Sequence, residues 1–254
     1  MKVLLKIRYV GTNYCGYQVQ PNGITVQQKL NEAARSVFGY DCDVVGCSRT
    51  DSGVHANLFC ATVSEKGQNR LRTEIPIDRI PLALSAHLPS DISVFEAEWV
   101  ADSFHARYDV REKEYIYRFY TGRIRDPFEE NRAYHVPALA DENAFLRMQE
   151  AAKHFCGTHD FSAYMAQGSK ILDAVRTVYT SELIRRGDVL IYRVCADGFL
   201  YNMVRILAGT LAAVGQGKIE PSEIDRITES RDRSKAGLTA PACGLYLNRV
   251  EYRK

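Results

Sequence analysis

Twelve consecutive residues, 203–214, contain a single charged side chain, that of Arg205, and otherwise consist of apolar or small residues. A helix that is apolar on every side is stable in water only when protein surrounds it. The segment therefore predicts a buried helix and a chain that builds layers of structure around it. An uncompensated buried charge is costly, so we expect Arg205 to pair with a carboxylate.

Stretches of alternating apolar and polar residues occur in both halves of the chain and predict the strands of these layers. Residues 2–9 are the clearest case, because Val3, Leu5, Ile7 and Tyr9 fall on one face. Further strands are expected at 43–47, 58–64, 92–99, 114–120, 176–184, 188–196 and 244–252. Helices are expected between Thr25 and Gly39, at 79–87 after a cap at Asp78, between Asp141 and Gly157, at 203–214 and near 222–230.

Helices and antiparallel-type strands are thus mixed in each half of the sequence. This mixture predicts an α+β protein with two lobes. We place the boundary near 98–107 and expect lobes at 1–105 and 106–254.

Composition limits the possible functions. The chain has 254 residues and a formal net charge of +2, which argues against a general nucleic-acid coat but permits a local basic groove. No apolar run approaches the roughly 18 residues of a membrane span. Lys2 and Lys6 interrupt any early secretion signal, so we expect a cytoplasmic protein. Seven cysteines without Cys-x-x-Cys spacing argue against a zinc site or a disulfide framework, and we expect no metal.

The densest cluster of reactive side chains is the segment 47–56, CSRTDSGVHA, which lies between two expected strands. Arg49, Asp51 and His55 next to a glycine suit a rigid active-site loop in which Asp51 is nucleophile, base or metal ligand. Spacing alone favours an ordinary Asp-Ser-Gly turn. Similarly, Tyr115 belongs to an alternating aromatic strand that pattern alone assigns to the core.

The segment Arg49-Thr50-Asp51-x-Gly53-Val54-His55-Ala56 resembles the catalytic signature of the tRNA pseudouridine synthase A family, and other motifs of that family follow in order. They are Tyr9-x-Gly11, Tyr14-x-Gly16-Tyr17-Gln18-x-Gln20, Thr25-Val26-Gln27, Leu88-Pro89-x-Asp91-Ile92, Phe104-His105-Ala106-Arg107, Lys113-x-Tyr115-x-Tyr117, Gly157-x-His159-Asp160-Phe161-Ser162, Phe199-Leu200-Tyr201-Asn202-Met203-Val204-Arg205 and Thr239-Ala240-Pro241-x-x-Gly244-Leu245. Three positions depart from the usual pattern, namely Tyr17 for tryptophan, Ser48 for glycine and 57–59 for a Gly-Gln pair.

The resemblance implies a role for each matching residue. It makes Asp51 the essential catalytic residue, Tyr115 the ring against the target base, and Arg205 the partner of Asp51. Arg49 is implied to bind the substrate by helping to displace the base from its stack. Such a base must leave the stem to react, at a cost of a few kcal/mol.

The resemblance also implies the fold and the partners. It predicts a pseudouridine synthase fold, in which antiparallel or mixed sheets of two related lobes join around a central catalytic cleft with helices on the outer face. It predicts a homodimer that isomerises uridine in the anticodon stem-loop of tRNA, at positions 38–40, without a small-molecule cofactor.

Two other classes of function remain open at this stage. A non-catalytic RNA-binding module would also carry aromatic strand residues beside arginines, although it would have no need of Asp51. A carboxylate-dependent nucleosidase or glycosidase would ordinarily need two acidic residues at the bond, and Asp51 is the one strong candidate.

Overall fold

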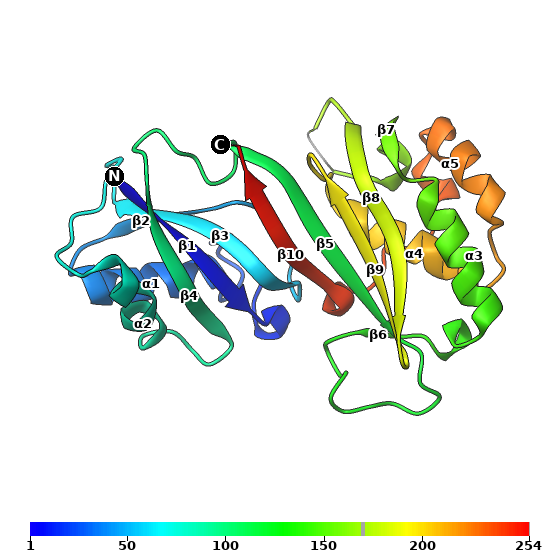
Figure 1. Ribbon diagram of the computed structural model, residues 1–254, viewed down its shortest axis with the longest axis horizontal. Coiled ribbons are helices and arrows are strands. Elements are labelled where there is room, and N and C mark those ends of the chain that lie inside the picture. Colours follow the sequence, from blue (N-terminus) through cyan, green and yellow to red (C-terminus); the bar gives the residue numbers. More distant parts are fainter. Residues whose placement is uncertain (169–170, 254) are drawn as a thin grey trace. The chain divides into compact units, whose positions relative to one another are not determined.

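The computed structural model describes residues 1–168 and 171–253, and contacts between residues divide the chain into two compact units. Unit 1 consists of Met1–Arg111 and Tyr246–Lys254, and unit 2 of Glu112–Leu245. The lobes expected from sequence were 1–105 and 106–254. The observed division falls a few residues later, inside a strand, and the last residues return to unit 1. In both units helices accompany a sheet, and the protein is α+β (Figure 1).

Unit 1 is built on a mixed sheet. Its strands lie in the order β4-β1-β3-β10, and β2 pairs with β3. Their bounds are β1 Lys2–Tyr9, β2 Cys42–Gly46, β3 His55–Glu65, β4 Ile92–Val100 and β10 Leu245–Tyr252. Pairing is antiparallel except between β10 and β3, where Tyr246 lies opposite His55. The first strand coincides with the alternating stretch 2–9, and its predicted inward face is buried.

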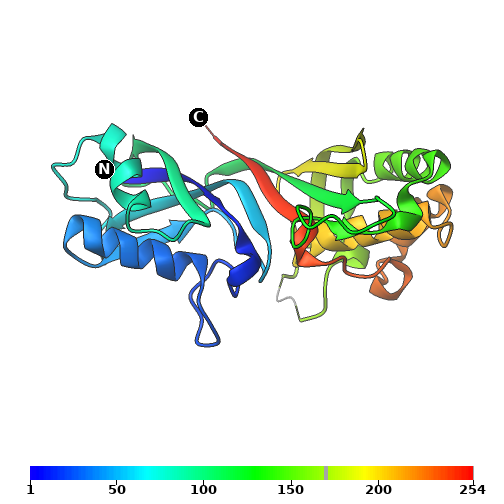
Figure 2. The same ribbon diagram turned by 90° about the horizontal axis from the view of Figure 1, so that it is seen from below.

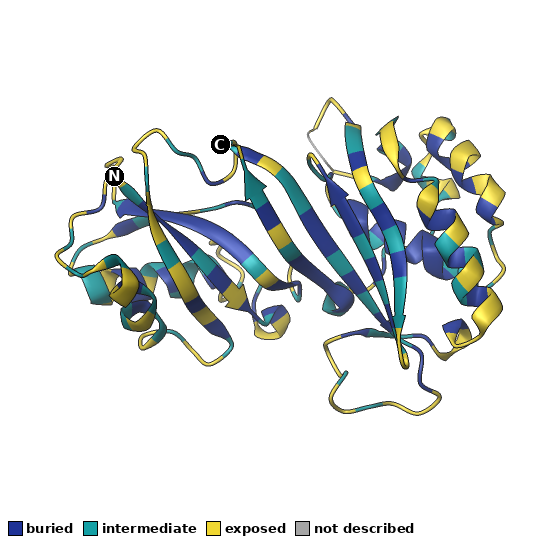
Figure 3. Ribbon diagram, viewed as in Figure 1, coloured by how far each residue is buried: buried dark blue, intermediate teal, exposed yellow. Residues whose placement is uncertain are grey.

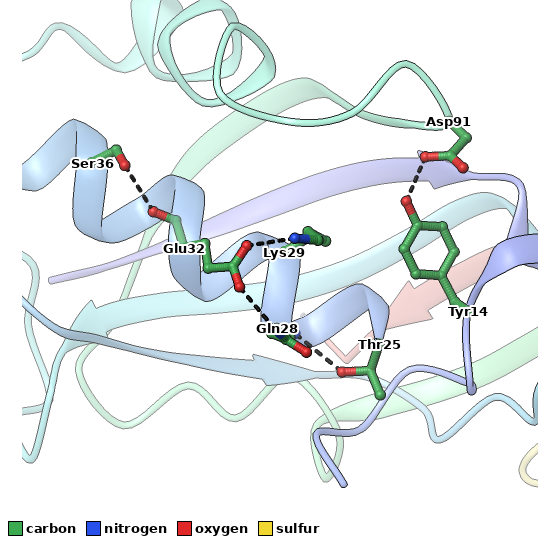
Figure 4. A network of polar contacts seen from close by, with 7 residues as sticks. All are labelled: Tyr14, Thr25, Gln28, Lys29, Glu32, Ser36 and Asp91. Carbon is green, nitrogen blue, oxygen red and sulfur yellow. Dashed lines mark hydrogen bonds and ion pairs between the residues drawn. The ribbon is translucent and has the colours of Figure 1, made fainter. Parts of the chain in front are cut away.

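The helix α1, Val26–Phe38, begins and ends where its capping residues predict. The Thr25 hydroxyl accepts a hydrogen bond from the Gln28 backbone N–H at 3.2 Å, and Gly39 ends the helix with φ +80°. The reciprocal half of a capping box is absent from this pair, because the Gln28 side chain donates to Glu32 instead (Figure 4). The helix runs along one side of the sheet of unit 1 (Figure 2).

A second helix of unit 1, α2 at Ile80–Ser85, corrects one expected boundary. Asp78 was expected to cap a helix at 79–87, but it lies within a 3₁₀ turn, Ile77–Arg79, and α2 has no side-chain cap. Pro81 stands in the first turn of α2, where a missing N–H costs nothing. Buried Ile80 and Leu84 anchor the helix.

Unit 2 carries a sheet in the order β5-β9-β8-β7, with β6 paired in parallel to β5. The strands are β5 Val110–Tyr120, β6 Tyr134–His135, β7 Gly157–Asp160, β8 Val175–Arg186 and β9 Val189–Ala196. The helices are α3 Glu142–Lys153, α4 Met203–Gly215 and α5 Ile224–Ser230. Neither β6 nor β7 was expected, because these segments are too short and polar to alternate.

The helix α4 is the expected buried helix, and Figure 3 shows it in the colour of buried residues over most of its length. Tyr115, Tyr117 and Phe119 share one buried face of β5, as their alternation predicts. On the opposite face Ile116 and Arg118 are only half-buried. The sheet of unit 2 is therefore covered fully on one side alone. Within residues 1–168 and 171–253, no helix combines the length and the apolar character that crossing a membrane requires.

Candidate active site

The segment 47–54 forms the connection from β2 to β3 in unit 1, and Asp51 stands at its bend. The Val54 N–H donates to the Asp51 carbonyl oxygen at 3.2 Å, and Gly53 adopts φ +79°. The backbone is therefore an ordinary turn, as spacing predicted, and the glycine supplies the left-handed conformation. Asp51 is half-buried, whereas the neighbouring Arg49 is exposed.

The residues 9–17, from the last residue of β1 into the connection that leads to α1, hold this turn by three hydrogen bonds. The hydroxyls of Tyr9 and Thr50 lie 2.8 Å apart and are buried. The Tyr17 N–H donates to the Thr50 carbonyl oxygen at 3.1 Å. The Ser52 hydroxyl donates to the Tyr14 carbonyl oxygen, also at 3.1 Å. Both residues that flank Asp51 are thus fixed to one segment, which we call the 9–17 strap.

Two glycines allow the strap to approach the turn this closely. A Cβ on Gly11 would lie 1.9 Å from the Val54 carbonyl oxygen. A Cβ on Gly16 would lie 2.6 Å from the Thr50 carbonyl oxygen, and Gly16 also has φ +81°. Any larger residue at either position would displace the backbone on one side or the other. The Tyr14 hydroxyl, which donates to Asp91 at 2.5 Å, anchors the middle of the strap (Figure 4).

His55, the third reactive side chain of the motif, has a structural hydrogen bond. Its Nδ1 accepts from the Gly11 N–H at 3.0 Å, and its ring lies 4.6 Å from the ring of Tyr246. Because Nδ1 accepts, the proton of the neutral ring belongs on Nε2. The side chain is almost completely buried, so His55 supports the loop from within.

Arg205 lies in the first turn of α4 in unit 2, and its guanidinium group is oriented from two sides. Its Nε donates to the Ala240 carbonyl oxygen at 2.8 Å, and its Nη1 donates to Oδ1 of Asn202 at 3.0 Å. The Ala240 N–H in turn donates to the Arg205 carbonyl oxygen at 3.1 Å. Asn202 caps α4 with φ +59°, a strained value for a non-glycine residue. Strain of this kind often marks functional positions.

The segment 237–241 packs directly on α4, which places Ala240 beside Arg205. A Cβ on Gly209 would lie 1.8 Å from the Leu238 carbonyl oxygen, so the two backbones are in contact. The Gly237 N–H also donates to the Thr210 hydroxyl at 2.9 Å. The Thr-Ala-Pro motif thus positions the arginine through its backbone.

Tyr115 lies on β5 opposite Val194, and its ring meets the ring of Phe199 edge to face at 5.0 Å. It is buried, like its neighbour Tyr117. The Tyr117 hydroxyl donates to the Pro241 carbonyl oxygen at 2.7 Å. Burial raises the pKa of Tyr117, although the positive charge of Arg205 acts in the opposite direction. Tyr117 is therefore part of the support around Arg205.

The structure divides the predicted site residues between the two units. Arg49 and Asp51 share one loop of unit 1, whereas Tyr115 and Arg205 belong to unit 2. Sequence reasoning missed three supporting residues: Tyr9, Asn202 and Phe199. Each stands inside a quoted motif, but Tyr9 alternates as a core residue, and nothing in the sequence indicates the left-handed backbone of Asn202.

Comparison with known proteins adds the decisive observation. A family model described as tRNA pseudouridine synthase matches residues 6–109 and 151–253, which together form most of the chain. The chain belongs to the tRNA pseudouridine synthase family. The matched segments include the Asp51 turn, the 9–17 strap, α4 and the Thr-Ala-Pro motif. Tyr115 lies outside them.

Relatives named tRNA pseudouridine synthase A match this family member over almost their whole length. The protein of Bacillus licheniformis is 44% identical over 254 residues, which cover 99% of both chains. That of Acetivibrio thermocellus is 44% identical over 250 residues, covering 98% of this chain and 99% of the relative. Among solved structures, one titled "Crystal Structure of a Cbf5-Nop10-Gar1 Complex" matches at 12% identity with a TM-score of 0.38, covering 96% of this chain and 57% of that chain.

Proposed function

We propose that the chain isomerises uridine to pseudouridine in the anticodon stem-loop of tRNA, at positions 38–40. Family membership supports the reaction, and one observation supports its assignment to a site. The Asp51 turn carries the family signature and is held rigidly by the 9–17 strap. A catalytic carboxylate needs this kind of preorganised backbone.

The reaction breaks the N1–C1′ bond of uridine, turns the base and joins C5 to C1′. The proton on C5 leaves and N1 gains one, so the product is an isomer and the reaction requires no redox cofactor. Asp51 supplies the carboxylate that acts on the ribose or the base. Arg205 pairs with this carboxylate and fixes its orientation, because a guanidinium group presents its donors in a rigid plane.

Tyr115 and Arg49 complete the proposed assignment. The ring of Tyr115 supports the extruded uracil by stacking, an interaction of about 1–3 kcal/mol per base. Phe199 fixes the orientation of that ring through its edge contact. The exposed Arg49 assists displacement of the base from its stack.

The proposal extends to assembly and location. We infer that the enzyme acts in the cytoplasm as a homodimer, in which two copies bind one large anionic substrate. The half-buried face of the unit 2 sheet offers a suitable surface, because Ile184 and Ile191 are paired across β8 and β9, and Ile116 lies on the same face of β5, opposite Arg193. Ile191→Lys should shift the mass measured by light scattering from dimer to monomer. A monomeric wild-type protein would contradict this part of the proposal.

A turnover assay on an unmodified tRNA transcript tests the function. Tritium release from tRNA labelled at uridine C5 should follow pseudouridine formation, and chemical mapping should locate the product at positions 38–40. Asp51→Asn should abolish both signals while leaving tRNA binding intact. Binding without turnover in the wild type would favour the RNA-binding module, and release of free uracil would favour the nucleosidase.

A further inference from the structure

A long uncharged segment adjoins the Asp51 turn. No Asp, Glu, Lys or Arg occurs between Arg8 and Lys29, although such residues form 25% of the chain. The segment includes the 9–17 strap and continues into residues 18–24. Buried packing accounts for the missing charges in the first part, because Tyr9, Tyr14 and Tyr17 are buried. Buried packing does not account for the missing charges in residues 18–24, because these residues are mostly exposed.

Residues 15–24 form a hairpin with internal hydrogen bonds, which we call the 15–24 hairpin. The Cys15 N–H donates to the Ile24 carbonyl oxygen at 2.8 Å, and Gln20 pairs with Gly23 near the tip. The Val19 N–H donates to the Gln27 side chain at 2.9 Å, which ties the hairpin to α1. Figure 2 shows it as a blue loop that projects from unit 1 beyond α1. These bonds make it an ordered projection.

The base of the hairpin touches the backbone of the Asp51 turn. Gly16 and Tyr17 belong to both the strap and the hairpin, and both contact Thr50, the residue before Asp51. When an RNA binds with one extruded nucleotide at Asp51, the nucleotides on either side of it therefore lie within reach of the hairpin.

The exposed side chains of the hairpin suit bases better than phosphates. Gln18 and Asn22 carry amide groups, which donate and accept hydrogen bonds as base edges do, whereas the Gln20 amide donates to the Cys15 carbonyl oxygen within the hairpin. Val19 and Ile24 are 50% and 51% exposed and present apolar surface without a covering element. A phosphate contact would ordinarily use lysine or arginine, and the hairpin has neither.

We propose that the 15–24 hairpin binds the nucleotides that flank the target uridine, through their base edges and faces rather than their phosphates. The proposal rests on the proposed tRNA activity. It assigns the hairpin a share of substrate selection, because flanking nucleotides differ between candidate uridines.

Two matched double variants test the proposal. Gln18→Ala/Asn22→Ala removes one glutamine and one asparagine from the hairpin. Gln68→Ala/Asn69→Ala removes the same pair from an exposed loop beyond the far end of β3. We expect the hairpin variant to raise KM for tRNA about tenfold, the usual scale of one lost base contact, and the control to leave it unchanged. The two double variants should have the same melting temperature.

Two further readouts separate base contacts from other causes. The slope of log kcat/KM against log salt should stay unchanged in the hairpin variant and become shallower by about one in Arg49→Ala. On stem-loop RNAs with abasic nucleotides beside the target uridine, the wild-type enzyme should be only as active as the hairpin variant is on intact RNA. The hairpin variant should be equally active on abasic and intact RNAs, because the abasic nucleotides and the alanine substitutions remove the same interaction.

Several results would overturn the inference. Equal activity of the two double variants would show that the hairpin does not bind substrate. If the losses of activity from the abasic RNA and from the hairpin substitutions add, the hairpin does not contact the flanking bases. A change of oligomeric state in the hairpin variant would assign the surface to a protein contact. If wild-type protein forms no pseudouridine, the proposed function itself fails, and this result is distinct from the others.

Discussion

The hydroxyl of Tyr9 lies 2.8 Å from the hydroxyl of Thr50, in a buried hydrogen bond that joins the end of β1 to the residue before Asp51. A strand residue that pattern assigns to the core thus also fixes the proposed catalytic turn. Its ring packs against Phe59 at 5.6 Å, so the ring and the hydroxyl serve different purposes. A substitution that removes only the hydroxyl can separate them.

Tyr9→Phe should lower kcat several-fold with little change in KM, because the Asp51 carboxylate loses part of its orientation. Its cost in stability should be about 1 kcal/mol, the usual net value of one hydrogen bond. Tyr164→Phe is the matched control, since Tyr164 and Thr228 form a similar buried pair at 3.1 Å in unit 2. The control should lose similar stability and retain its kcat. Equal kcat losses in both variants would assign the Tyr9 bond to stability alone.

Gly16→Ala should reduce both activity and stability, and Gly39→Ala should reduce stability only. The two glycines have nearly equal φ angles, +81° and +80°, so an alanine costs about 1–2 kcal/mol at either position. Gly39 has open space around it, whereas a Cβ on Gly16 meets the Thr50 carbonyl oxygen. Urea unfolding and turnover measured on both variants check the difference. Full activity in Gly16→Ala would mean that the strap tolerates displacement.

These contacts show where sequence reasoning succeeds and where it stops. The bounds of β1 and α1 could be predicted, because alternation and capping are local properties of a few residues. The cap expected at Asp78 was wrong, since Pro81 and the preceding 3₁₀ turn start α2 without a side-chain cap. The short polar strand β7 was missed because its four residues do not alternate.

The candidate site was predictable to a different degree. The residue types at Asp51, Tyr115 and Arg205 could be chosen from the resemblance, and their assigned roles stay predictions. The supports around them could not be chosen, because they are close approaches between distant segments. Gly16 meets Thr50, and Gly209 meets Leu238, through backbone atoms that leave no compositional pattern.

Stability at low pH should depend on Asp160, which ends β7. Burial alone would raise the pKa of Asp160, but hydrogen bonds from Ser162 and the charge of Arg231 outweigh burial and lower it. A lowered folded-state pKa stabilises the protein above the unfolded-state pKa, and this contribution disappears as the pH falls through the folded-state value. Below about pH 4, wild type should therefore lose stability faster than Asp160→Asn. Urea unfolding between pH 7 and pH 3 measures this, and parallel curves would contradict it.

Substitutions of Asn202 can separate the backbone strain at this residue from its role in orienting the guanidinium group of Arg205. Asn202→Gly should relieve the strain of φ +59° and remove the acceptor for Arg205, so stability is kept while kcat falls about tenfold, a loss of roughly 1.4 kcal/mol in the transition state. Asn202→Ala should lose both stability and activity, because alanine keeps the strain without the hydrogen bond. Asn202→Asp retains the acceptor oxygen and should preserve more activity than either. Asn131→Gly provides the control, since Asn131 is an exposed asparagine of unit 2 with φ +57° and makes no described hydrogen bond to Arg205. If Asn202→Gly keeps full kcat while its melting temperature is unchanged, the Asn202–Arg205 bond does not position the arginine for catalysis.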